Sequence, residues 1–381
     1  MVGIQADDLT GACDTGAPFA ARGLDTLVIV SDGDGPPALP RTTTTSVLVV
    51  DTESRMLPVE EARARARAAG SALKVGPPRV LYKKVDSTLR GHVAAEMDGM
   101  LDGSGLALAL LAPAFPAQGR TVVDGQLHVD GRLADETAIA RDPAFPPTGA
   151  SLLALLAAGL VAPATALPLS TVRQGSGPVA ERLRRFAGVG GRALSADAET
   201  DADLGTLVGA ASQDGMLLAG SAGLANALAT RLPRTGSAER AGAPPRPRRP
   251  LIVVAGTAHP AIRTQLARLG SRDGLEILAP PSDRGADDVA GRRETAARLG
   301  DAARARVGRA RPGAVLLTGG ETAIAVVRAL GASALRLAGE LEPGLALGTL
   351  VGGPLEGLVV MTKAGGFGDA DTLVRAWEAC A

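Results

Sequence analysis

Short apolar runs alternate with longer amphipathic stretches along most of this chain, and this alternation is the strongest constraint on its fold. The runs at residues 26–30 and 46–50 have the length and the β-branched composition of buried strands. Residues 58–73 carry charges spaced as on a surface helix. Strands that alternate with helices pack as a mainly parallel sheet with helices on both faces. The sequence therefore predicts the α/β fold class.

The alternation stops at residues 233–250 and then resumes. This segment is rich in proline and arginine and, proline aside, has no apolar side chain larger than alanine, so it cannot bury enough surface to order itself. A chain of 381 residues is also longer than one compact core usually requires. We expect two domains, 1–232 and 251–381, joined by a linker at 233–250, each with a mainly parallel sheet flanked by helices. The other expected strands are 2–5, 80–83, 106–111, 216–219, 251–255, 275–278, 314–317 and 358–361, and the other expected helices are 90–101, 150–160, 221–232, 259–269, 289–307, 321–330 and 369–379.

Composition excludes several classes of function. The chain has 40 basic and 40 acidic residues and 2% aromatic residues, whereas nucleic-acid and membrane-surface binding need a basic excess, and base stacking needs aromatic side chains. Its two cysteines, Cys13 and Cys380, suit neither a disulfide framework nor a zinc site. The N-terminus lacks the features of a signal peptide, and no apolar run is long enough to span a membrane. We expect a cytoplasmic protein with a small-molecule partner and with neither a nucleic-acid nor a membrane partner.

Three glycine-rich turns in the second half, at 256–258, 319–322 and 364–368, each follow an expected strand and precede an expected helix. The carboxyl ends of parallel strands share one edge of the sheet, and turns there point backbone N–H groups at a ligand such as a phosphate. Any one of these turns is equally well explained as a tight connection between a strand and a helix. The three together favour a nucleotide site. Neither the P-loop nor the dinucleotide-binding fingerprint is present among these turns.

A cluster of acidic residues follows the first expected strand. Residues 7–16 contain three carboxylates, Asp7, Asp8 and Asp14, and two hydroxyl groups. Asp8 or Thr10 could cap a helix that runs to residue 21, which is the alternative explanation. A single cap does not require three acids, and crowded like charges normally need a ligand, a metal or a cationic partner.

A second polar cluster, residues 83–91, follows the strand at 80–83. Arg90 could hold a substrate carboxylate through two parallel hydrogen bonds, and Lys84 or Asp86 could reach a hydroxyl group. An ion pair with the first acidic cluster is a compatible alternative. Arg120 ends a rigid, proline-containing loop after the strand at 106–111, and we expect it to lie at the same edge of the sheet.

The segments ADDLTGACDTG, KKVDSTLRG, APAFPAQGRT, TGGETA, GELEPGLALG and TKAGGFGD, in this order, resemble those of the four-carbon acid sugar kinases. The resemblance covers residues 3–376, and its first and last segments are the most specific. It implies an N-terminal substrate domain, a C-terminal ATP domain and an active site in the interdomain cleft. It further implies transfer from ATP, with Mg²⁺, to the terminal hydroxyl of an acid such as threonate, erythronate or 3-oxo-tetronate, and a possible homodimer.

The resemblance also assigns residues. Substrate contacts fall on Asp7, Asp8, Lys84 and Arg90. Arg120, expected at the same edge of the sheet, is a further candidate for a substrate contact. The catalytic base is one of Asp8, Asp7 and Asp86. The metal ligands are not indicated, and Cys13, His92 and His259 depart from the family pattern. ATP contacts fall on Thr257, Gly319, Gly320, Glu321, Thr322, Gly365, Gly366 and Gly368.

Two other functions fit the same outline. A non-catalytic sugar-acid sensor would share the two-domain pattern, but it would need neither three phosphate-type turns nor a crowded acidic pair. A dehydrogenase would need a dinucleotide fingerprint, which is missing from these turns. The sequence therefore favours the kinase.

Overall fold

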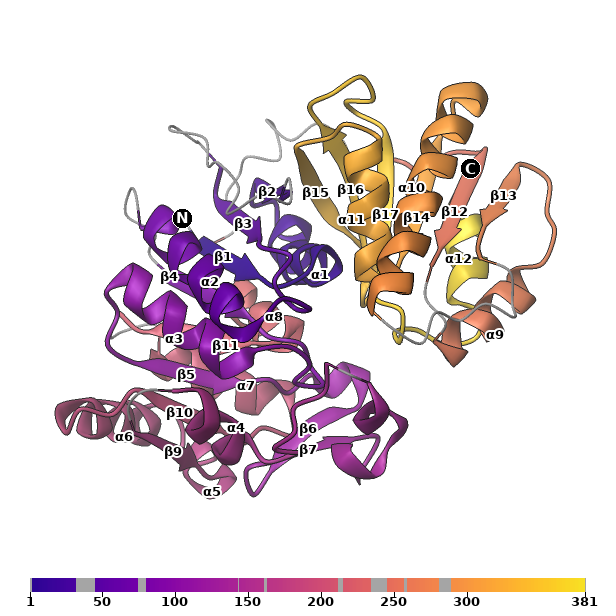
Figure 1. Cartoon of the computed structure of the whole chain (residues 1–381). Helices are drawn as coiled ribbons and strands as arrows, with labels where there is room; N and C mark the ends of the chain where they lie inside the picture. Colours follow the sequence, from indigo (N-terminus) through magenta and orange to yellow (C-terminus); the bar gives the residue numbers. More distant parts are fainter. Residues whose placement is uncertain are drawn as a thin grey trace. The chain divides into compact units, whose positions relative to one another are not determined.

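The computed structural model describes residues 2–31, 45–74, 80–142, 144–160, 163–211, 215–233, 245–256, 259–280 and 289–380. Its contacts divide the chain into two compact units (Figure 1). The first unit comprises Met1–Asp7 and Gly33–Pro233, and the second comprises Asp8–Asp32 and Arg234–Ala381. The chain thus passes from one unit to the other at the peptide bond between Asp7 and Asp8.

Residues 8–32 pack with the C-terminal half, although the sequence assigns them to the N-terminal domain. The helix α1 (Leu9–Ala21) lies against the strands β15 (Ala334–Glu342) and β16 (Leu345–Val351). The strand β2 (Thr26–Ile29) pairs antiparallel with β15. These contacts join residues some three hundred positions apart, which local sequence patterns do not indicate. The expected functional division of the chain into domains stays a prediction.

The first unit is built on a parallel sheet, which confirms the α/β class. Its described strands follow the order β3-β1-β4-β11-β5-β10-β9, and every neighbouring pair is parallel. All the strand ends that carry polar motifs therefore lie at one edge. The strands are β1 (Val2–Ala6), β3 (Val47–Asp51), β4 (Val80–Lys84), β5 (Ala109–Ala112), β9 (Ala164–Leu167), β10 (Ala193–Ala196) and β11 (Leu217–Gly220).

Helices cover this sheet, and a small antiparallel ribbon extends from it. Ser221 caps α8 by accepting a hydrogen bond from the Gly223 amide, as expected. The helix expected from residue 90 begins at Val93, because residues 86–92 form a turn around Asp86. The sequence did not predict β9, β10, α5–α7 or the ribbon. The helices are α2 (Val59–Leu73), α3 (Val93–Ser104), α4 (Leu152–Gly159), α5 (Leu169–Val172), α6 (Ser176–Gly188), α7 (Asp201–Ala211) and α8 (Ala222–Arg231), and the ribbon strands are β6 (Arg120–Val123), β7 (Gln126–Val129) and β8 (Arg132–Leu133).

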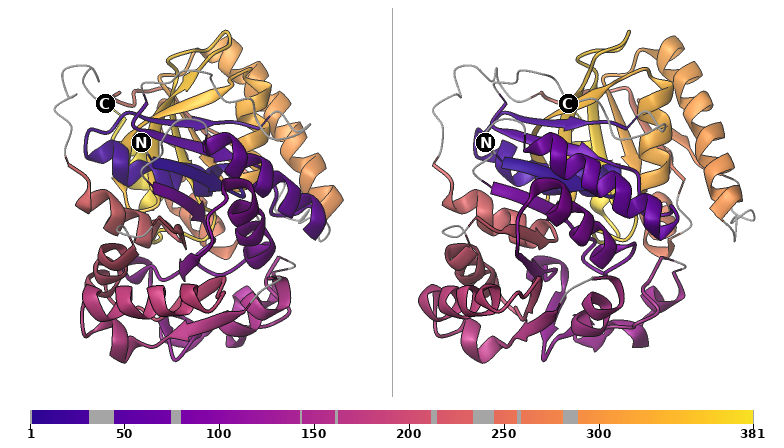
Figure 2. Two further views of the ribbon diagram at one scale, coloured as in Figure 1. Left: turned by 90° about the vertical axis from the view of Figure 1, so that its left-hand side faces the viewer. Right: turned by 60° about the vertical axis from the view of Figure 1, so that its left-hand side comes forward.

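Glycines allow α2 and α3 to approach each other closely (Figure 2). A Cβ atom on Gly99 or Gly103 would overlap the backbone carbonyl oxygens of Arg63 and Arg67, and one on Gly70 would lie 2.9 Å from the Met100 carbonyl oxygen. Backbone atoms cannot move aside as a flexible side chain can. The two helices therefore depend on the absence of side chains at these positions.

We expect Gly99→Ala to destabilise the protein, although alanine normally favours a helix. Overpacking costs about 1–3 kcal/mol, which exceeds the propensity gain of about 0.5–1 kcal/mol. Gly205 in α7 is the matched control, since a Cβ there would meet no atom within 4 Å, and Gly205→Ala should raise stability. Urea denaturation of both variants measures the difference. A stabilised Gly99→Ala protein would contradict the close packing.

The second unit combines parallel and antiparallel strands in the order β13-β12-β14-β17-β16-β15-β2. The pairs between β13 and β17 are parallel, and the pairs from β17 to β2 are antiparallel. The sequence did not predict β15 and β16. The strands named here for the first time are β12 (Leu251–Ala255), β13 (Leu275–Leu278), β14 (Ala314–Thr318) and β17 (Val359–Lys363), and the further helices are α9 (Pro260–Leu269), α10 (Val289–Ala310), α11 (Gly320–Ala329) and α12 (Thr372–Glu378).

The core of the second unit lies between this sheet and α9 and α12. Val253, Leu316 and Met361 from neighbouring strands are fully buried in one cluster with Leu373 of α12. The helices α10 and α11 pack on each other and contact β12 and β14 (Figure 2). Within the described residues, none of the helices combines the length and the apolar character that a membrane span requires.

The end of the expected linker is ordered against the C-terminal helix. The guanidinium of Arg249 lies 3.9 Å from the ring centroid of Trp377 in α12, and that of Arg272 lies 4.9 Å from it. Such cation–π contacts contribute about 0.5–1 kcal/mol at exposed sites. Residues 245–250 therefore belong to the packed second unit, while residues 234–244 lie outside the described residues.

Candidate active site

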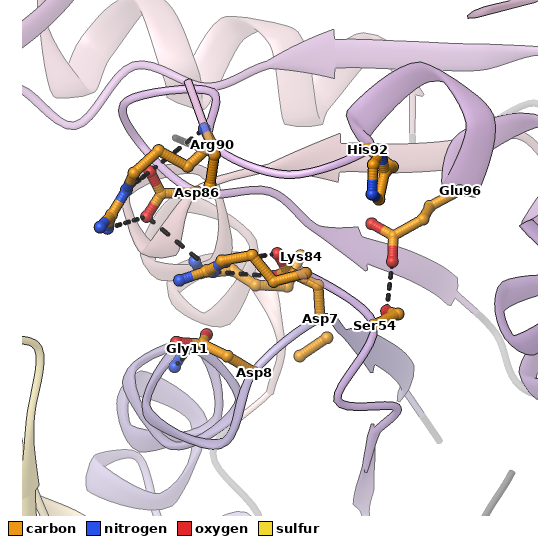
Figure 3. A network of polar contacts seen from close by, with 12 residues as sticks. Asp7, Asp8, Gly11, Ser54, Lys84, Asp86, Arg90, His92 and Glu96 are labelled. Carbon is orange, nitrogen blue, oxygen red and sulfur yellow. Dashed lines mark hydrogen bonds and ion pairs between the residues drawn. The ribbon is translucent and has the colours of Figure 1, made fainter. Parts of the chain in front are cut away.

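Three neighbouring parallel strands bring the polar motifs of the first unit together. The strand β1 lies between β3 and β4, and Asp7, Arg55 and Asp86 follow these strands at their carboxyl ends. Figure 3 shows Asp86 and Arg90 beside each other at the end of β4, with Asp7 and Lys84 in the same network. Sheet geometry therefore explains why residues from three separate sequence segments form one cluster.

Asp7 is held by an arginine that the sequence did not single out. Arg55 donates from Nε to Asp7 Oδ2 at 2.7 Å and from Nη2 to Asp7 Oδ1 at 3.0 Å. Burial by itself would raise the pKa of Asp7, but the charges of Arg55 and Lys83 outweigh it and lower the pKa to about 2. Asp7 is thus an ionised, buried carboxylate with a fixed orientation. Arg55 follows the expected strand at 46–50, and this position at the carboxyl edge of the sheet could have identified it as a candidate site residue.

Asp86 and Arg90 form the second buried ion pair. Arg90 donates to Asp86 from Nε and from Nη2, each at 2.9 Å, and its Nη1 lies 3.3 Å from Asp142. The Thr88 amide donates to the same carboxylate at 3.1 Å. Burial opposes ionisation of Asp86, but Arg90 and Arg55 hold its pKa well below the usual range. In this structure, the guanidinium expected to clamp a substrate carboxylate is engaged by two carboxylates of the protein itself.

Lys84 is the buried cation of this cluster that lacks an ion pair. Its side chain is 4% exposed, and its ammonium makes no hydrogen bond or ion pair with a described residue. Its charge nevertheless contributes to lowering the pKa of both Asp7 and Asp86. The buried Ser87 Oγ, three residues further on, also has no hydrogen-bond partner among the described residues. An ammonium and a hydroxyl group are therefore available to a ligand.

Arg120 adds a further positive charge near this cluster. Burial lowers its pKa, which the charges of Asp130 and Asp86 oppose, and Arg90 acts on it as a like charge. Arg120 begins β6, and its guanidinium donates to the Gln118 carbonyl. The structure thus places Arg120 within electrostatic reach of Asp86 and Arg90, as expected from its position after β5.

A buried network of Lys83, Glu96 and Ser54 lies next to the cluster of Asp7, Arg55 and Asp86. Lys83 lies 3.0 Å from Glu96 of α3 and donates to the Lys84 carbonyl oxygen at 2.6 Å. Ser54 donates to the same Glu96 carboxylate (Figure 3). Burial raises the pKa of Glu96, and the Lys83 charge opposes that shift. These groups fix the loop that carries Arg55 and the end of β4 that carries Lys84.

Asp8 belongs to the second unit and caps α1. Its Oδ1 accepts from the Gly11 amide at 2.9 Å, and its Oδ2 accepts from Thr10 Oγ1 at 2.9 Å (Figure 3). The helix-cap explanation is therefore correct for Asp8. The carboxylate also faces another element, since a Cβ atom on Gly320 would lie 2.6 Å from Asp8 Oδ2. Asp8 thus combines a structural role with a position beside the first residue of α11.

The three glycine-rich turns follow three neighbouring parallel strands, β12, β14 and β17. Gly319 donates its amide to the Lys363 carbonyl oxygen at 3.1 Å, which ties the second turn to the third. Thr322, in the first turn of α11 after Glu321, packs its hydroxyl against Gly256 of the first turn. Gly365, Gly366 and Gly368 follow β17 in the third turn. Thr257 lies outside the described residues.

The three histidines have local structural contacts. His92 Nε2 lies 2.6 Å from the Leu57 carbonyl oxygen, and His128 Nδ1 lies 3.1 Å from the Gln126 carbonyl oxygen. His259 caps α9 by accepting from the Ala261 amide, and its ring lies beside Gly366. His259 is therefore the histidine nearest to the glycine turns.

Known proteins resemble this chain in both halves of its sequence. A family model described as a sugar-binding N-terminal domain matches residues 2–228, and one described as a nucleotide-binding C-terminal domain matches residues 279–373. A D-threonate kinase of Bordetella bronchiseptica is 36% identical over 99% of this chain and 97% of its own length. The chain belongs to the four-carbon acid sugar kinase family. This four-carbon acid sugar kinase is accordingly a phosphotransferase that acts on an alcohol group.

Other relatives of this four-carbon acid sugar kinase carry related names. A D-threonate kinase of Salmonella typhimurium is 33% identical over 98% of this chain and 96% of its own, and a 3-oxo-tetronate kinase of Methylobacterium radiotolerans is 31% identical over 99% and 98%. Among solved structures, a DUF1537 protein of Haemophilus influenzae shares the fold, with a TM-score of 0.73 and 23% identity over 99% of both chains. A DUF1537 domain of Bordetella bronchiseptica, solved as a domain-swapped dimer with bound citrate, is 33% identical over 99% of this chain and 98% of its own, with a TM-score of 0.51.

Proposed function

We propose that this enzyme transfers the terminal phosphoryl group of ATP to the O4 hydroxyl of a four-carbon sugar acid, and that D-threonate is its substrate. The choice of D-threonate rests on the relatives named D-threonate kinase, at 36% and 33% identity, against 30% and 31% for relatives named D-erythronate kinase and 3-oxo-tetronate kinase. The observation that carries the acceptor class is the buried ammonium of Lys84, which has no ion pair with any described residue, whereas Arg55 and Arg90 beside it are paired.

In this proposal, the acid's carboxylate pairs with Lys84. The ionised Asp7 and the hydroxyl of Ser87 are suited to bind the acid's hydroxyl groups, since one accepts and the other can both donate and accept. Arg90 and Arg120 supply positive charge around the same place. A sugar acid carries one negative charge and several hydroxyl groups, which suits a site with the Lys84 ammonium and several fixed acceptors.

ATP is the proposed phosphoryl donor, bound by the three turns of the second unit. Backbone N–H groups of Gly320, Gly365, Gly366 and Gly368 suit phosphate oxygens, because glycine lets the backbone approach closely. The N–H of Gly319 is bound to the Lys363 carbonyl oxygen, so Gly319 would contribute close approach and not a hydrogen bond. Thr257, Glu321 and Thr322 complete the expected contacts. The N-terminus of α11 adds the favourable end of a ten-residue helix dipole.

Magnesium is proposed to enter with the nucleotide. The described residues contain no group of three or more His, Cys, Asp and Glu side chains that could hold a metal by themselves. Mg²⁺ in phosphoryl-transfer sites is usually held by one or two carboxylates plus the phosphates, so such a group is not required. When bound, the ion would neutralise charge on the transferred group.

Asp8 is also the proposed base that orients and deprotonates the acceptor hydroxyl. Asp7 and Asp86 are bound by arginines, which lower their pKa values and make them weak bases. The Asp8 carboxylate accepts from the Gly11 amide and the Thr10 hydroxyl and faces the glycine turn, which places it beside the proposed phosphate site. Phosphoryl transfer depends mainly on positioning and charge stabilisation, so one oriented carboxylate suffices.

A homodimer is proposed by analogy with the Bordetella bronchiseptica dimer.

A panel assay tests the function. We expect ATP-dependent ADP release with D-threonate, and slower release with D-erythronate, L-threonate and 3-oxo-tetronate. Phosphorus NMR of the product should show coupling to the two C4 protons, which identifies O4. Release of no ADP with any acid, together with measurable binding of D-threonate, would support the sensor instead. A change in nicotinamide absorbance would support the dehydrogenase.

A further inference from the structure

The strand β17 ends at a lysine that is buried beneath the third glycine turn. The Lys363 side chain is 1% exposed, and its Nζ donates to the carbonyl oxygens of Phe367 at 2.7 Å, Ala364 at 2.8 Å and Gly365 at 3.4 Å. No carboxylate of a described residue lies within ion-pair distance of it. The three donors of this ammonium are thus directed to one loop.

A second buried side chain draws in the same loop from the helix side. Gln265 of α9 is 0% exposed, and its Nε2 donates to the carbonyl oxygens of Phe367 at 3.1 Å and Asp369 at 2.8 Å. Together, Lys363 and Gln265 bind the carbonyl oxygens of residues 364, 365, 367 and 369. Four of six consecutive peptide groups therefore turn their oxygens toward the interior of the unit.

The opposite side of each peptide group follows from its planarity. In a trans peptide, the N–H of the next residue points away from the carbonyl oxygen. The amides of Gly365, Gly366, Gly368 and Ala370 therefore point away from Lys363 and Gln265, and none of the four donates to a described residue. Several free amides directed outward from one loop form the kind of concave site that binds phosphate oxygens.

We propose that Lys363 is a positioning residue for the nucleotide site: by gathering the carbonyl oxygens of the loop, it presents the amides of Gly365, Gly366 and Gly368 to the phosphates of ATP. This proposal rests on the proposed function for the nature of the ligand. Lys363 does not touch the phosphates; it acts through the loop, and its charge lies on the far side of the amides, where it adds to their positive potential.

The contrast with Lys83 supports a specific role. Lys83 is the penultimate residue of β4 in the first unit and is equally buried, but it has a carboxylate partner, Glu96, at 3.0 Å. Within the part of the chain that the structure describes, Lys363 bonds to backbone oxygens alone. Burial lowers the pKa of Lys363 to about 7, although the charge of Glu342 opposes the shift. A buried cation without a carboxylate partner is costly to stability and is typical of functional sites.

The protonation state of Lys363 should make ADP binding depend on pH. Below about pH 7 the ammonium has three N–H donors, and above it the amine has only two, so the loop loses part of its support as the pH rises. Other ionisable groups lie near: Glu342 on β15 and Asp369 in the loop, both paired with Arg375 of α12, and His259 beside Gly366. Histidine side chains ordinarily change charge near neutral pH, so the effect of His259 is tested separately.

Calorimetric binding of MgADP tests the proposal without any acceptor. For Lys363→Met we expect the Kd for ADP and the KM for ATP to rise at least tenfold, with the KM for the sugar acid unchanged. Lys74→Met, the same change at an exposed position after α2, is the control and should match the wild type. Gln265→Leu should weaken ADP binding in the same direction by a smaller factor.

If Lys363→Met does not fold, the pH dependence of ADP binding by the wild type tests the role of Lys363. Wild-type affinity for ADP should fall between pH 6.5 and 8.5, and His259→Asn, which keeps a capping side chain, should show the same fall. A folded Lys363→Met protein with wild-type ADP affinity, or a flat wild-type profile, would overturn the role of Lys363. A wild type that binds ADP but phosphorylates no acid would overturn the proposed function alone, and one that binds no ADP would overturn both.

Discussion

Replacing Asp8 by asparagine is expected to reduce kcat about 10²–10⁴-fold, the usual contribution of a positioned acid–base group. Asparagine keeps an oxygen that can accept from the Gly11 amide, so α1 should remain capped and the fold intact. The change removes the negative charge and the basic oxygen beside Gly320. Coupled ADP-release assays measure kcat, and MgADP calorimetry should show a Kd within about threefold of the wild type.

Asp25→Asn is the matched control for this prediction. Asp25 lies in the same unit and pairs with Arg336 at a partly exposed position, so the same chemical change there should leave kcat unaltered. Near-normal turnover in Asp8→Asn would remove Asp8 from the chemistry. Asp86 and Asp7 would then be the remaining candidates, each weakened as a base by its arginine partner.

Much of the fold follows from local patterns. The runs that became β1, β3 and β12 are short, apolar and bounded by polar turns, and the sequence therefore predicted them. It also predicted the three glycine turns, which the structure places after three neighbouring parallel strands. The antiparallel strands β15 and β16 were not predicted, because the glycine and proline residues of GELEPGLALG interrupt the apolar pattern that indicates a strand.

The acidic pair shows where sequence reasoning ends. Asp7 and Asp8 are adjacent in the chain, and a local pattern treats them as one feature. Their partners are decided by packing between distant segments: Asp7 pairs with Arg55 in the first unit, whereas Asp8 faces Gly320 in the second. The two carboxylates therefore have different environments, and we assign them different roles.

The balance of charges in the first unit points to Lys84 as the main determinant of acceptor binding. Asp7 pairs with Arg55, Asp86 and Asp142 pair with Arg90, and Glu96 pairs with Lys83. Lys84 makes no ion pair within the described residues, although its charge acts on Asp7 and Asp86 from a greater distance. Its ammonium therefore has no close partner there that a substrate carboxylate would need to displace. The arginine that the sequence favoured for this task is already paired.

Replacing Lys84 by methionine should therefore raise the KM for D-threonate about 10–100-fold, the range for loss of one hydrogen bond to a charged group. The Kd for ADP should stay unchanged, because the nucleotide turns belong to the second unit. The free energy of unfolding should change little, since removing the buried ammonium relieves its desolvation but also removes its attraction to Asp7 and Asp86. Steady-state kinetics, ADP calorimetry and urea denaturation measure the three quantities, with Lys74→Met as the control.

A neutral acceptor separates a direct contact from a general disturbance. The amide of threonic acid keeps the hydroxyl groups but lacks the carboxylate charge. If Lys84 binds that carboxylate, the wild type and Lys84→Met should use the amide with similar KM values, so the effects of the two changes are not additive. Equal losses for acid and amide would show that Lys84 only supports the site. The carboxylate contact would then have to come from Arg90 or Arg120, after one of them exchanges a protein partner for the substrate.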